Sequence, residues 1–289
     1  MDHPRVLQRE DTTVSTRAFS PLMVRIYSAL FLAGTALFLT LTSVEGFAVL
    51  IVIAMAAMAW EWGRLVRGKG LDPAFAAQFT ATAAACWAAT SGFPAAAIGI
   101  VIAGTVAVFL IRRMSEKRSL ALWSASGVYY AGLPAISLIW LRGDETHGTL
   151  AVIYLFVIVW TTDIAAYFFG RLIGGARLAP RISPKKTWAG LIGGVLTAGL
   201  AGLLFAYSTG LEIPWLGAMA VGFALVAQLG DLGESAIKRI FGKKDSSSLI
   251  PGHGGILDRI DGLVSVAVVA ALVALGIDSA NPGQALLIW

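Results

Sequence analysis

The sequence is poor in charged residues and in cysteine. Only 13% of its 289 residues are Asp, Glu, Lys or Arg, whereas soluble domains carry about 25%. Hydrophobic residues make up 57% of the chain, and its mean hydropathy is +0.77, which excludes an ordinary soluble domain. The single cysteine, Cys86, excludes a disulfide framework and a thiolate metal site, and we expect it to pack inside an apolar segment. Because repeats, low-complexity tracts and long linkers are also lacking, residues 1–289 are interpreted as one membrane domain.

Long hydrophobic runs are abundant instead. About 20 apolar residues are enough to cross a bilayer as a helix, and nine such runs predict an all-α, polytopic integral membrane protein. Residues 1–22 are predicted to be a flexible cytoplasmic tail, and the first run lacks a small-residue cleavage site, which favours an anchor over a signal peptide. The predicted spans form an N-terminal group (23–141) and a more polar, catalytic group (147–278), near residues 25–43, 46–66, 73–91, 94–112, 119–141, 147–170, 187–208, 213–240 and 261–278.

Lysine and arginine gather in alternate segments. If the N-terminus is cytoplasmic, all 22 except Arg142 fall in the tail or near the loops after the second, fourth, sixth and eighth spans. Positive residues accumulate in short cytoplasmic loops, so we expect a cytoplasmic N-terminus and a C-terminus on the far side. This orientation accounts for the net charge of +5 without a nucleic-acid partner. The pattern is typical of a bacterial inner (cytoplasmic) membrane.

Residues 231–261 hold most of the chemistry-bearing side chains. Asp231, Glu234, Ser235 and Lys238 have the spacing i, i+3, i+4, i+7, which predicts one shared helix face. A carboxylate at the end of a membrane span is costly unless it has a partner. Asp231 is therefore interpreted as a metal ligand, with a structural ion pair to Lys238 or Arg239 as the alternative.

A basic cluster and a glycine loop follow that helix. The loop can bring N–H groups against an anion, and His253 within it either contacts a ligand or only bonds to the backbone. Two acids follow one helical turn apart. Carboxylates suit a hard cation and basic groups suit phosphates, so the region predicts a site for a metal-bound phosphate substrate. Its members are Lys238, Arg239, Lys243, Lys244, the Pro251-Gly252-His253-Gly254-Gly255 loop, Asp258 and Asp261.

A second polar region surrounds the loop after the sixth span. Asp163 and Tyr167 are i, i+4 neighbours, so Asp163 either serves the site or makes a helix–helix hydrogen bond. The segment 183–187 (Ser-Pro-Lys-Lys-Thr) is predicted to open a helix, where anions bind favourably. Both polar loops are expected on the cytoplasmic side, where they could enclose a nucleoside triphosphate. Glu61, between two tryptophans, is interpreted as an interfacial anchor.

The fixed positions of these regions resemble the signature of the CDP-diacylglycerol synthases, also called phosphatidate cytidylyltransferases. Every fixed position of that signature matches within residues 235–261, and residues 163–187 are similar to a second region of the family. The resemblance covers about residues 150–265. The matching positions are Ser235, Lys238, Arg239, Lys244, Asp245, Pro251, His253, Gly254, Gly255, Asp258, Arg259 and Asp261, with Asp163, Tyr167, Gly170, Arg171 and Ser183–Thr187 upstream.

The resemblance implies a magnesium-dependent transfer of a cytidylyl group from CTP to phosphatidate, giving CDP-diacylglycerol and pyrophosphate for phospholipid biosynthesis. It also implies Asp231 and Asp258 as ligands of a paired metal centre, with a monovalent cation such as K⁺ beside Mg²⁺, Asp261 as a further ligand or neighbour, and a homodimer. Lys238 and Arg239 join these acids as expected catalytic residues. The expected substrate-binding residues are Asp163, Ser183, Lys185, Lys186, Ser235, Lys244, Asp245, His253, Gly254, Gly255 and Arg259.

Two other functions fit the composition. A cation-coupled transporter also uses intramembrane carboxylates. However, the acids here gather at one membrane face, and the nearby loops are basic and glycine-rich. A different lipid-phosphate transferase, such as one that attaches a sugar phosphate to a polyprenyl carrier, would share the metal-binding acids but not the signature.

Overall fold

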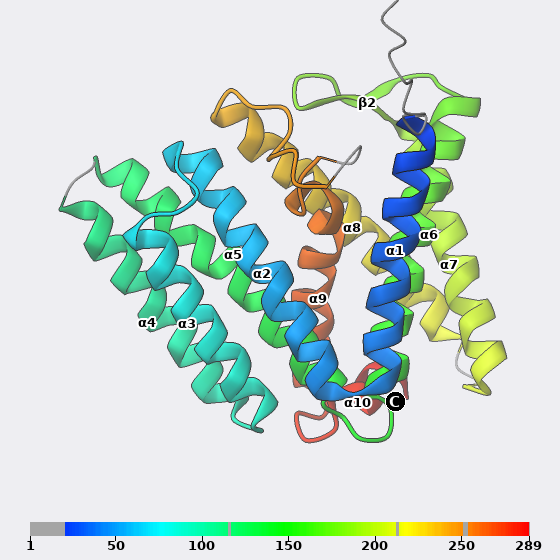
Figure 1. Cartoon of the computed structure of the whole chain (residues 1–289). Helices are drawn as coiled ribbons and strands as arrows, with labels where there is room; N and C mark the ends of the chain where they lie inside the picture. The colour runs from blue at the N-terminus through cyan, green and yellow to red at the C-terminus, as the bar shows by residue number, and fades with distance from the viewer. Residues whose placement is uncertain (1–20, 115–116, 212–213, 251–253, 289) are drawn as a thin grey trace, which may run out of the picture.

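The computed structural model describes residues 21–114, 117–211, 214–250 and 254–288. These residues form nine long helices, a short tenth helix and one two-stranded hairpin, which confirms the all-α class (Figure 1). The elements are α1 (Pro21–Thr42), α2 (Val44–Arg67), α3 (Pro73–Thr90), α4 (Pro94–Arg113), α5 (Arg118–Arg142), α6 (Gly148–Leu172), β1 (Arg177–Ala179), β2 (Ser183–Thr187), α7 (Trp188–Thr209), α8 (Trp215–Ile240), α9 (Leu257–Ile277) and α10 (Pro282–Leu287).

The predicted spans coincide with the long helices to within a few residues. In the described residues, eight helices are long and apolar enough to cross a membrane, and α3 falls short because glutamine and threonine dilute its alanines. Even so, α3 runs alongside α4 along its length (Figure 1). The largest differences are at two helix starts: α1 begins at Pro21 rather than at residue 25, which takes residues 21 and 22 out of the predicted tail, and α9 begins at Leu257 rather than at residue 261.

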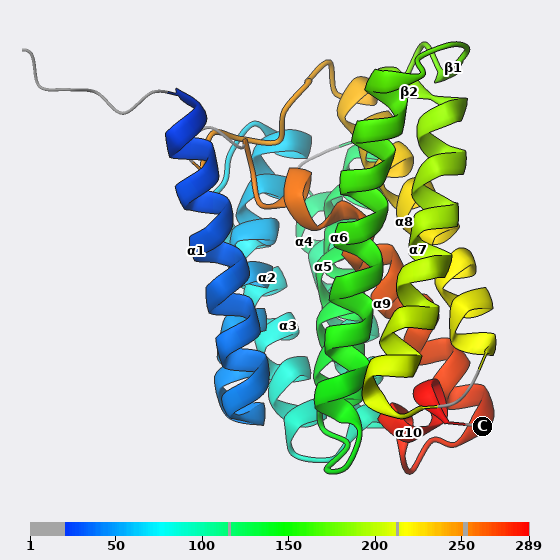
Figure 2. The same cartoon turned by 90° about the vertical axis from the view of Figure 1, so that its right-hand side faces the viewer.

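The helices run up and down between two ends of the molecule. The hairpin, the α8–α9 loop and the start of α1 lie at one end, whereas α10 lies at the other (Figures 1 and 2). The described basic residues therefore gather at the hairpin end, as the charge pattern predicts. Arg142 lies at the opposite end, where its Nε donates to the Thr40 carbonyl, 2.8 Å away, in the last turn of α1. A cation at a helix C-terminus is favourable.

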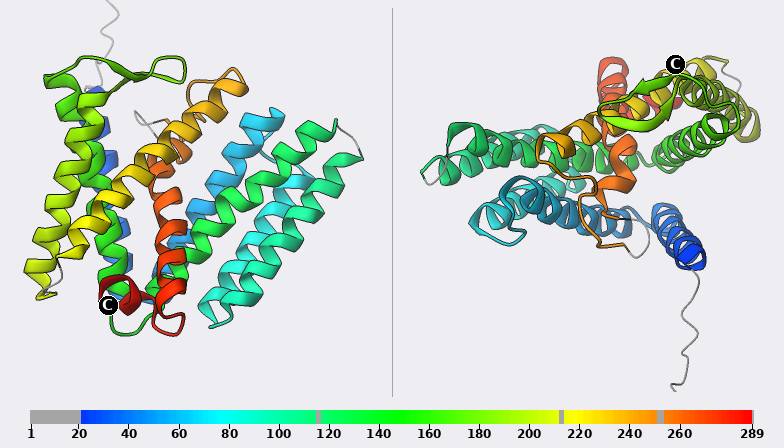
Figure 3. Two further views of the ribbon diagram at one scale, coloured as in Figure 1. Left: turned by 180° about the vertical axis from the view of Figure 1, so that it is seen from behind. Right: turned by 90° about the horizontal axis from the view of Figure 1, so that it is seen from above.

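Two groups of helices flank α8 and α9. Helices α2 to α5 form one group, and α6 and α7 pack closely as the other (Figure 3). Glycines in α7 let its neighbours approach closely, because a Cβ at Gly190 would lie 2.7 Å from the Ala166 carbonyl of α6 and one at Gly202 would lie 2.8 Å from the Leu216 carbonyl of α8. Small residues at such contacts are typical of helix packing in membranes. Cys86 is buried, as expected of a packing residue.

The hairpin was not predicted. Ser183–Thr187 forms β2 and pairs antiparallel with β1, so the prediction that this segment opens a helix is wrong for its first four residues. Thr187 alone serves as the N-cap of α7, since its side chain accepts the Gly190 N–H at 3.1 Å. The hairpin therefore presents Lys185 and Lys186 from extended backbone rather than from a helix end.

Candidate active site

A polar pocket of about 1030 Å³ opens at the hairpin end of the molecule. It is large enough for a nucleotide, since small-molecule pockets span about 300–1,000 Å³. Its lining comes from α1, α6, the hairpin, α7, α8, the α8–α9 loop and α9. The lining side chains that can carry charge are Arg25, Asp163, Arg171, Arg177, Lys185, Lys186, Asp231, Lys238, Lys244, Asp245, Asp258, Arg259 and Asp261.

The acids on one side of the pocket are connected through Lys186 and Gln228. Lys186 Nζ lies 2.7 Å from Asp231 Oδ2 and 3.1 Å from Gln228 Oε1. The Gln228 amide in turn donates to Asp163 Oδ1 at 3.5 Å. Asp231 thus has an ion-pair partner, but it is Lys186 from the hairpin rather than Lys238 or Arg239. Asp163 faces Gln228 rather than Tyr167.

Lys238 is buried between two carboxylates. Its Nζ lies 2.5 Å from Glu234 Oε2 and 2.5 Å from Asp258 Oδ1. The predicted polar face of α8 is therefore divided: Asp231 and Lys238 line the pocket, whereas Glu234 and Ser235 are buried beside it. Ser235 still contacts the site, because its Oγ donates to Asp231 Oδ1 at 3.4 Å.

The described residues of the α8–α9 loop contact the Asp258 carboxylate. Asp258 Oδ2 accepts from Ser246 Oγ at 2.9 Å, Ser246 N at 3.1 Å and Gly255 N at 2.9 Å. Gly254 has a φ of +83°, which favours glycine, and a Cβ there would lie 2.9 Å from Asp258 Oδ2. The loop thus holds one of the expected metal ligands, and the Gly255 N–H is already bonded.

Most predicted site residues meet at the pocket. Those lining it are Asp163, Lys185, Lys186, Asp231, Lys238, Lys244, Asp245, Gly254, Asp258, Arg259 and Asp261. Ser183, Ser235, Arg239 and Gly255 do not line it. Arg239 instead joins α8 to the hairpin, donating to the Ile182 carbonyl at 3.2 Å and to the Lys243 carbonyl at 2.9 Å. His253 lies outside the described residues.

Several residues at or beside the site were not predicted, among them Gln228, Arg25 and Glu61. Gln228 lies within an apolar run, and Arg25 enters the sequence argument only as one of the positive charges that indicate membrane orientation. No motif around either residue indicates a binding site. Glu61 was interpreted as an interfacial anchor, but it is fully buried. Its carboxylate accepts hydrogen bonds from the α8–α9 loop and the start of α9. The signal for Glu61 was a carboxylate inside a hydrophobic run, which indicates a buried partner.

The carboxylates suit a hard cation by their chemistry. Within the described part of the chain, no three histidine, cysteine or acidic side chains already form a metal-binding group. Asp231 and Asp258 each lie against a lysine ammonium instead, at 2.7 and 2.5 Å. Oxygen ligands of this kind are those that Mg²⁺ prefers, usually with retained water and substrate phosphates. The donor set therefore fits magnesium bound together with a phosphate substrate.

A pocket at the end of a bundle of apolar helices that combines acids from three helices with lysines from the hairpin and the α8–α9 loop is typical of an enzyme acting on phosphates at a bilayer surface. Comparison with known proteins agrees: the model of the cytidylyltransferase family matches residues 23–275. The chain belongs to this family.

Several curated relatives are similar over long stretches, and each bears the name phosphatidate cytidylyltransferase. The protein from Brucella suis biovar 1 (strain 1330) is 41% identical over 271 residues, covering 91% of this chain and 96% of the relative. The protein from Rickettsia bellii (strain RML369-C) is 43% identical over 149 residues, covering 49% of this chain and 64% of the relative. The protein from Haemophilus influenzae (strain ATCC 51907 / DSM 11121 / KW20 / Rd) is 41% identical over 143 residues, covering 47% of this chain and 50% of the relative. The resemblance noted in the sequence is confirmed.

Proposed function

We propose that this protein transfers a cytidylyl group from CTP to phosphatidate, forming CDP-diacylglycerol and releasing pyrophosphate. The observation that carries the proposal is the polar pocket at one end of the helix bundle, where acids from α6, α8 and α9 meet basic side chains from the hairpin and the α8–α9 loop. The family match and the names of the relatives favour the same reaction over a cation-coupled transporter.

The reaction requires alignment and charge neutralisation more than acid–base chemistry. The second pKa of a phosphate monoester is about 6, so the headgroup of phosphatidate is largely a dianion at neutral pH and is itself the nucleophile. An oxygen of that headgroup bonds to the α-phosphorus of CTP, and the bond from the α-phosphorus to the pyrophosphate oxygen breaks. Several negative charges must be brought together, which the basic lining of the pocket favours.

Magnesium is part of the proposal. Asp231 and Asp258 are the proposed ligands, with Asp261 as an additional ligand or neighbour and K⁺ as a candidate second ion. A bound divalent cation would offset charge on the triphosphate and on the leaving pyrophosphate. Asp231 and Asp258 each hold a cationic group at contact distance here, which supports their suitability as ligands.

The two substrates approach from different sides of the pocket in this proposal. Lys244 and Asp245 belong to the α8–α9 loop, and we assign this side to CTP. Arg25 belongs to α1, most of whose large side chains are exposed where lipid would surround them. We therefore assign Arg25 to the lipid phosphate. Lys185 and Lys186, on the hairpin opposite the loop, could contact either substrate.

The pocket is proposed to face the cytoplasm of a bacterial cell, in the inner membrane. CTP is a cytoplasmic metabolite, and the segments that carry the described basic residues, apart from Arg142, meet at the same end as the pocket (Figure 1), as the positive-inside rule requires. A homodimer is also proposed, on the strength of the family resemblance.

One assay tests the reaction. The purified protein would be incubated with magnesium, phosphatidate and each of the four nucleoside triphosphates labelled at the α-phosphate, with Asp231→Asn as control. We expect label to enter lipid from CTP and not from the control. Equal labelling from UTP would contradict the cytidylyl assignment, and cation flux in proteoliposomes without lipid labelling would favour the transporter.

A further inference from the structure

Glu61 is a fully buried carboxylate on α2, far in sequence from the site. Four donor groups from the α8–α9 loop and the start of α9 lie within hydrogen-bond distance of it. Oε1 accepts from Ser247 Oγ at 2.6 Å and Ile256 N at 2.9 Å. Oε2 accepts from Ser246 Oγ at 3.1 Å and Leu257 N at 2.8 Å. A buried carboxylate is stable only with such bonding, so α2 and this loop depend on each other.

Two of these donors, the N–H groups of Ile256 and Leu257, lie at the N-cap and first positions of α9. The initial N–H groups of a helix lack partners within the helix, and its positive dipole end favours an anion. Ile256, at the N-cap position, makes no side-chain cap bond of its own. Glu61 therefore caps α9 from another helix, which explains why α9 begins at Leu257, earlier than the hydrophobic pattern alone predicts.

Ser246 connects Glu61 to the site. Its Oγ lies 3.1 Å from Glu61 Oε2 and 2.9 Å from Asp258 Oδ2. A hydroxyl carries one proton, so Ser246 donates to one carboxylate at a time. Gly255 is confined by the same arrangement, since a Cβ there would collide with Ser246 Oγ and lie 2.5 Å from Glu61 Oε1. The second glycine of the pair thus leaves space for Glu61.

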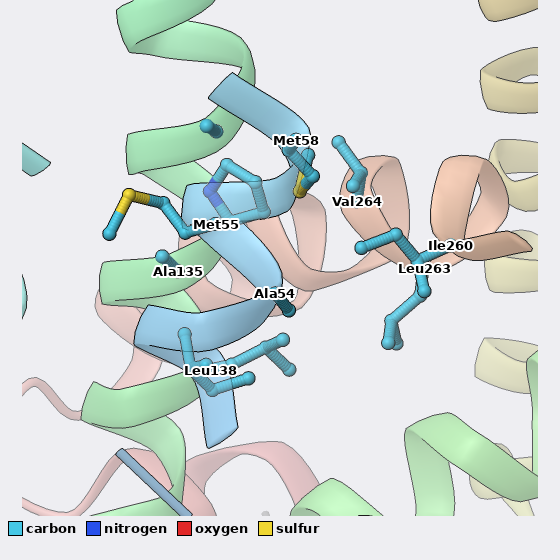
Figure 4. Close-up of a pocket in the computed structure, with 11 residues that line it drawn as sticks. Ala54, Met55, Met58, Ala135, Leu138, Ile260, Leu263 and Val264 are labelled. Carbon is cyan, nitrogen blue, oxygen red and sulfur yellow. The ribbon is translucent and has the colours of Figure 1, made fainter. Parts of the chain in front are cut away.

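The helix that carries Glu61 is itself firmly packed. Met55 and Met58, one to two turns before Glu61, form a buried cluster with Ala131, Leu257 and Val264. Figure 4 shows side chains of α2, α5 and α9 around a small pocket of about 30 Å³ lined entirely by apolar residues. Leu257 is therefore fixed by two interactions: its N–H donates to Glu61, and its side chain packs against the cluster that contains Met55 and Met58.

We propose that Glu61 is a positioning residue for the active site: it fixes residues 246–247 and 256–257 and, through Ser246, the carboxylate of Asp258. Glu61 does not line the pocket, so it acts through these residues and not by contact with substrate. The catalytic consequence rests on the proposed cytidylyl transfer, whereas the structural one does not. The two consequences are therefore measured separately.

Hydrogen–deuterium exchange in lipid nanodiscs, without CTP or phosphatidate, measures the structural consequence. Glu61→Gln keeps the shape but offers one acceptor oxygen in place of two, and each lost bond to a charged acceptor corresponds to about tenfold or more in an opening equilibrium. We expect peptides covering Ile256 and Leu257 to exchange at least about tenfold faster, with α3 and α4 unchanged. Glu45→Gln, an exposed acid at the other end of α2, is the matched control and should exchange like wild type.

Kinetics measure the catalytic consequence. Glu61→Gln should lower kcat/KM for CTP about tenfold or more and raise the magnesium concentration needed for half-maximal rate, while Glu45→Gln does neither. Ser247→Ala removes one donor and should give a smaller change in the same direction. The double variant Glu61→Gln/Ser247→Ala should lose less than the product of the single effects, because both changes remove one shared bond.

Three outcomes would overturn the proposal. They are wild-type exchange at residues 256–257 in Glu61→Gln, faster exchange spread equally over all helices, and faster local exchange with unchanged kinetics. Should Glu61→Gln fail to fold, the same exchange measurement is made on Ser247→Ala. Faster exchange confined to residues 256–257 supports the proposal, and faster exchange over all helices contradicts it. If wild type transfers no cytidylyl group while exchange behaves as expected, the proposed function fails and the positioning of residues 246–247 and 256–257 by Glu61 stands.

Discussion

The ammonium of Lys186 lies 2.7 Å from Asp231 Oδ2, joining the hairpin to α8 across the pocket. The two side chains are partly exposed, at 17% and 29%, so the pair lies where a ligand can reach it. Because Lys186 also contacts Gln228, it links the acids of α8 and α6. The two polar regions recognised separately in the sequence therefore form one site.

Removing charge from the proposed metal ligands should abolish turnover. Asp231→Asn and Asp258→Asn keep the side-chain shape but lose the charge that a hard cation requires. Asp231→Asn should leave thermal stability close to wild type, because its one ion pair is partly exposed. Asp258→Asn should also destabilise the protein, because the buried ammonium of Lys238 would then face a neutral amide in place of the Asp258 carboxylate. Near wild-type activity of either variant across a magnesium titration would show that its residue is not a ligand.

Lys244→Ala should weaken use of CTP. Losing one ammonium contact to a phosphate costs about 1.5–3 kcal/mol, which corresponds to roughly a tenfold to hundredfold fall in kcat/KM for CTP. The two substrates should be varied separately at a fixed lipid mole fraction in detergent. A loss confined to phosphatidate, with unchanged CTP kinetics, would contradict placement of the triphosphate beside the glycine loop. Lys186→Ala is expected to lower kcat/KM for CTP or for phosphatidate, because Lys186 could contact either substrate.

Arg25→Ala should show the opposite selectivity. Arg25 lines the pocket from α1, and its loss should raise the apparent KM for phosphatidate about tenfold or more, with little change for CTP. Arg113→Ala removes a charge from the same end of the molecule but not from the pocket, and is the control. Equal effects of the two variants would mean that Arg25 acts only through general surface charge.

Membrane orientation can be measured directly. Reporter fusions in the 171–186 loop and after residue 289 should report opposite sides, with the loop in the cytoplasm, because the hairpin and α10 lie at opposite ends of the helix bundle (Figure 2). Reports from one side only would mean that α3 or another helix does not cross the membrane.

Asp72 should stabilise the protein except in acid. Burial alone would raise the pKa of this carboxyl, but the Phe75 N–H and the Arg67 guanidinium outweigh it and hold the pKa below its ordinary value of 3.8. A lowered folded-state pKa contributes stability that is present above about pH 4 and is lost as the pH falls through the folded value.

Asp72→Ala should cost about 3–5 kcal/mol at neutral pH, because Arg67 stays buried without its partner. Asp72→Asn keeps a good N-cap but removes the negative charge, so it separates the effect of the ion pair on stability from the effect of the cap. The difference in melting temperature between wild type and Asp72→Asn should shrink as the pH falls below about 4. A difference independent of pH would show that the cap, and not the charge, carries the stability.

Local patterns predicted much of this molecule. Hydrophobic runs fixed the spans because each depends on about 20 consecutive residues, and helical spacing placed Asp231 and Lys238 toward one pocket. The hairpin was missed because the five residues of β2 lack the alternation of a half-buried strand. The cap on α9 was missed because Glu61 and Leu257 lie 196 positions apart. Pairings of that range depend on tertiary packing, which spacing along one helix does not encode.

The distance along the chain between α2 and α9 bears on how the protein is made. The segment that holds Asp258 can take its final form only after the ninth long helix has entered the membrane and met a carboxylate inserted many helices earlier. Assembly of the site is therefore a late event in biogenesis. Residues 147–289 expressed alone should insert as helices yet stay inactive until residues 1–146 are supplied in the same membrane.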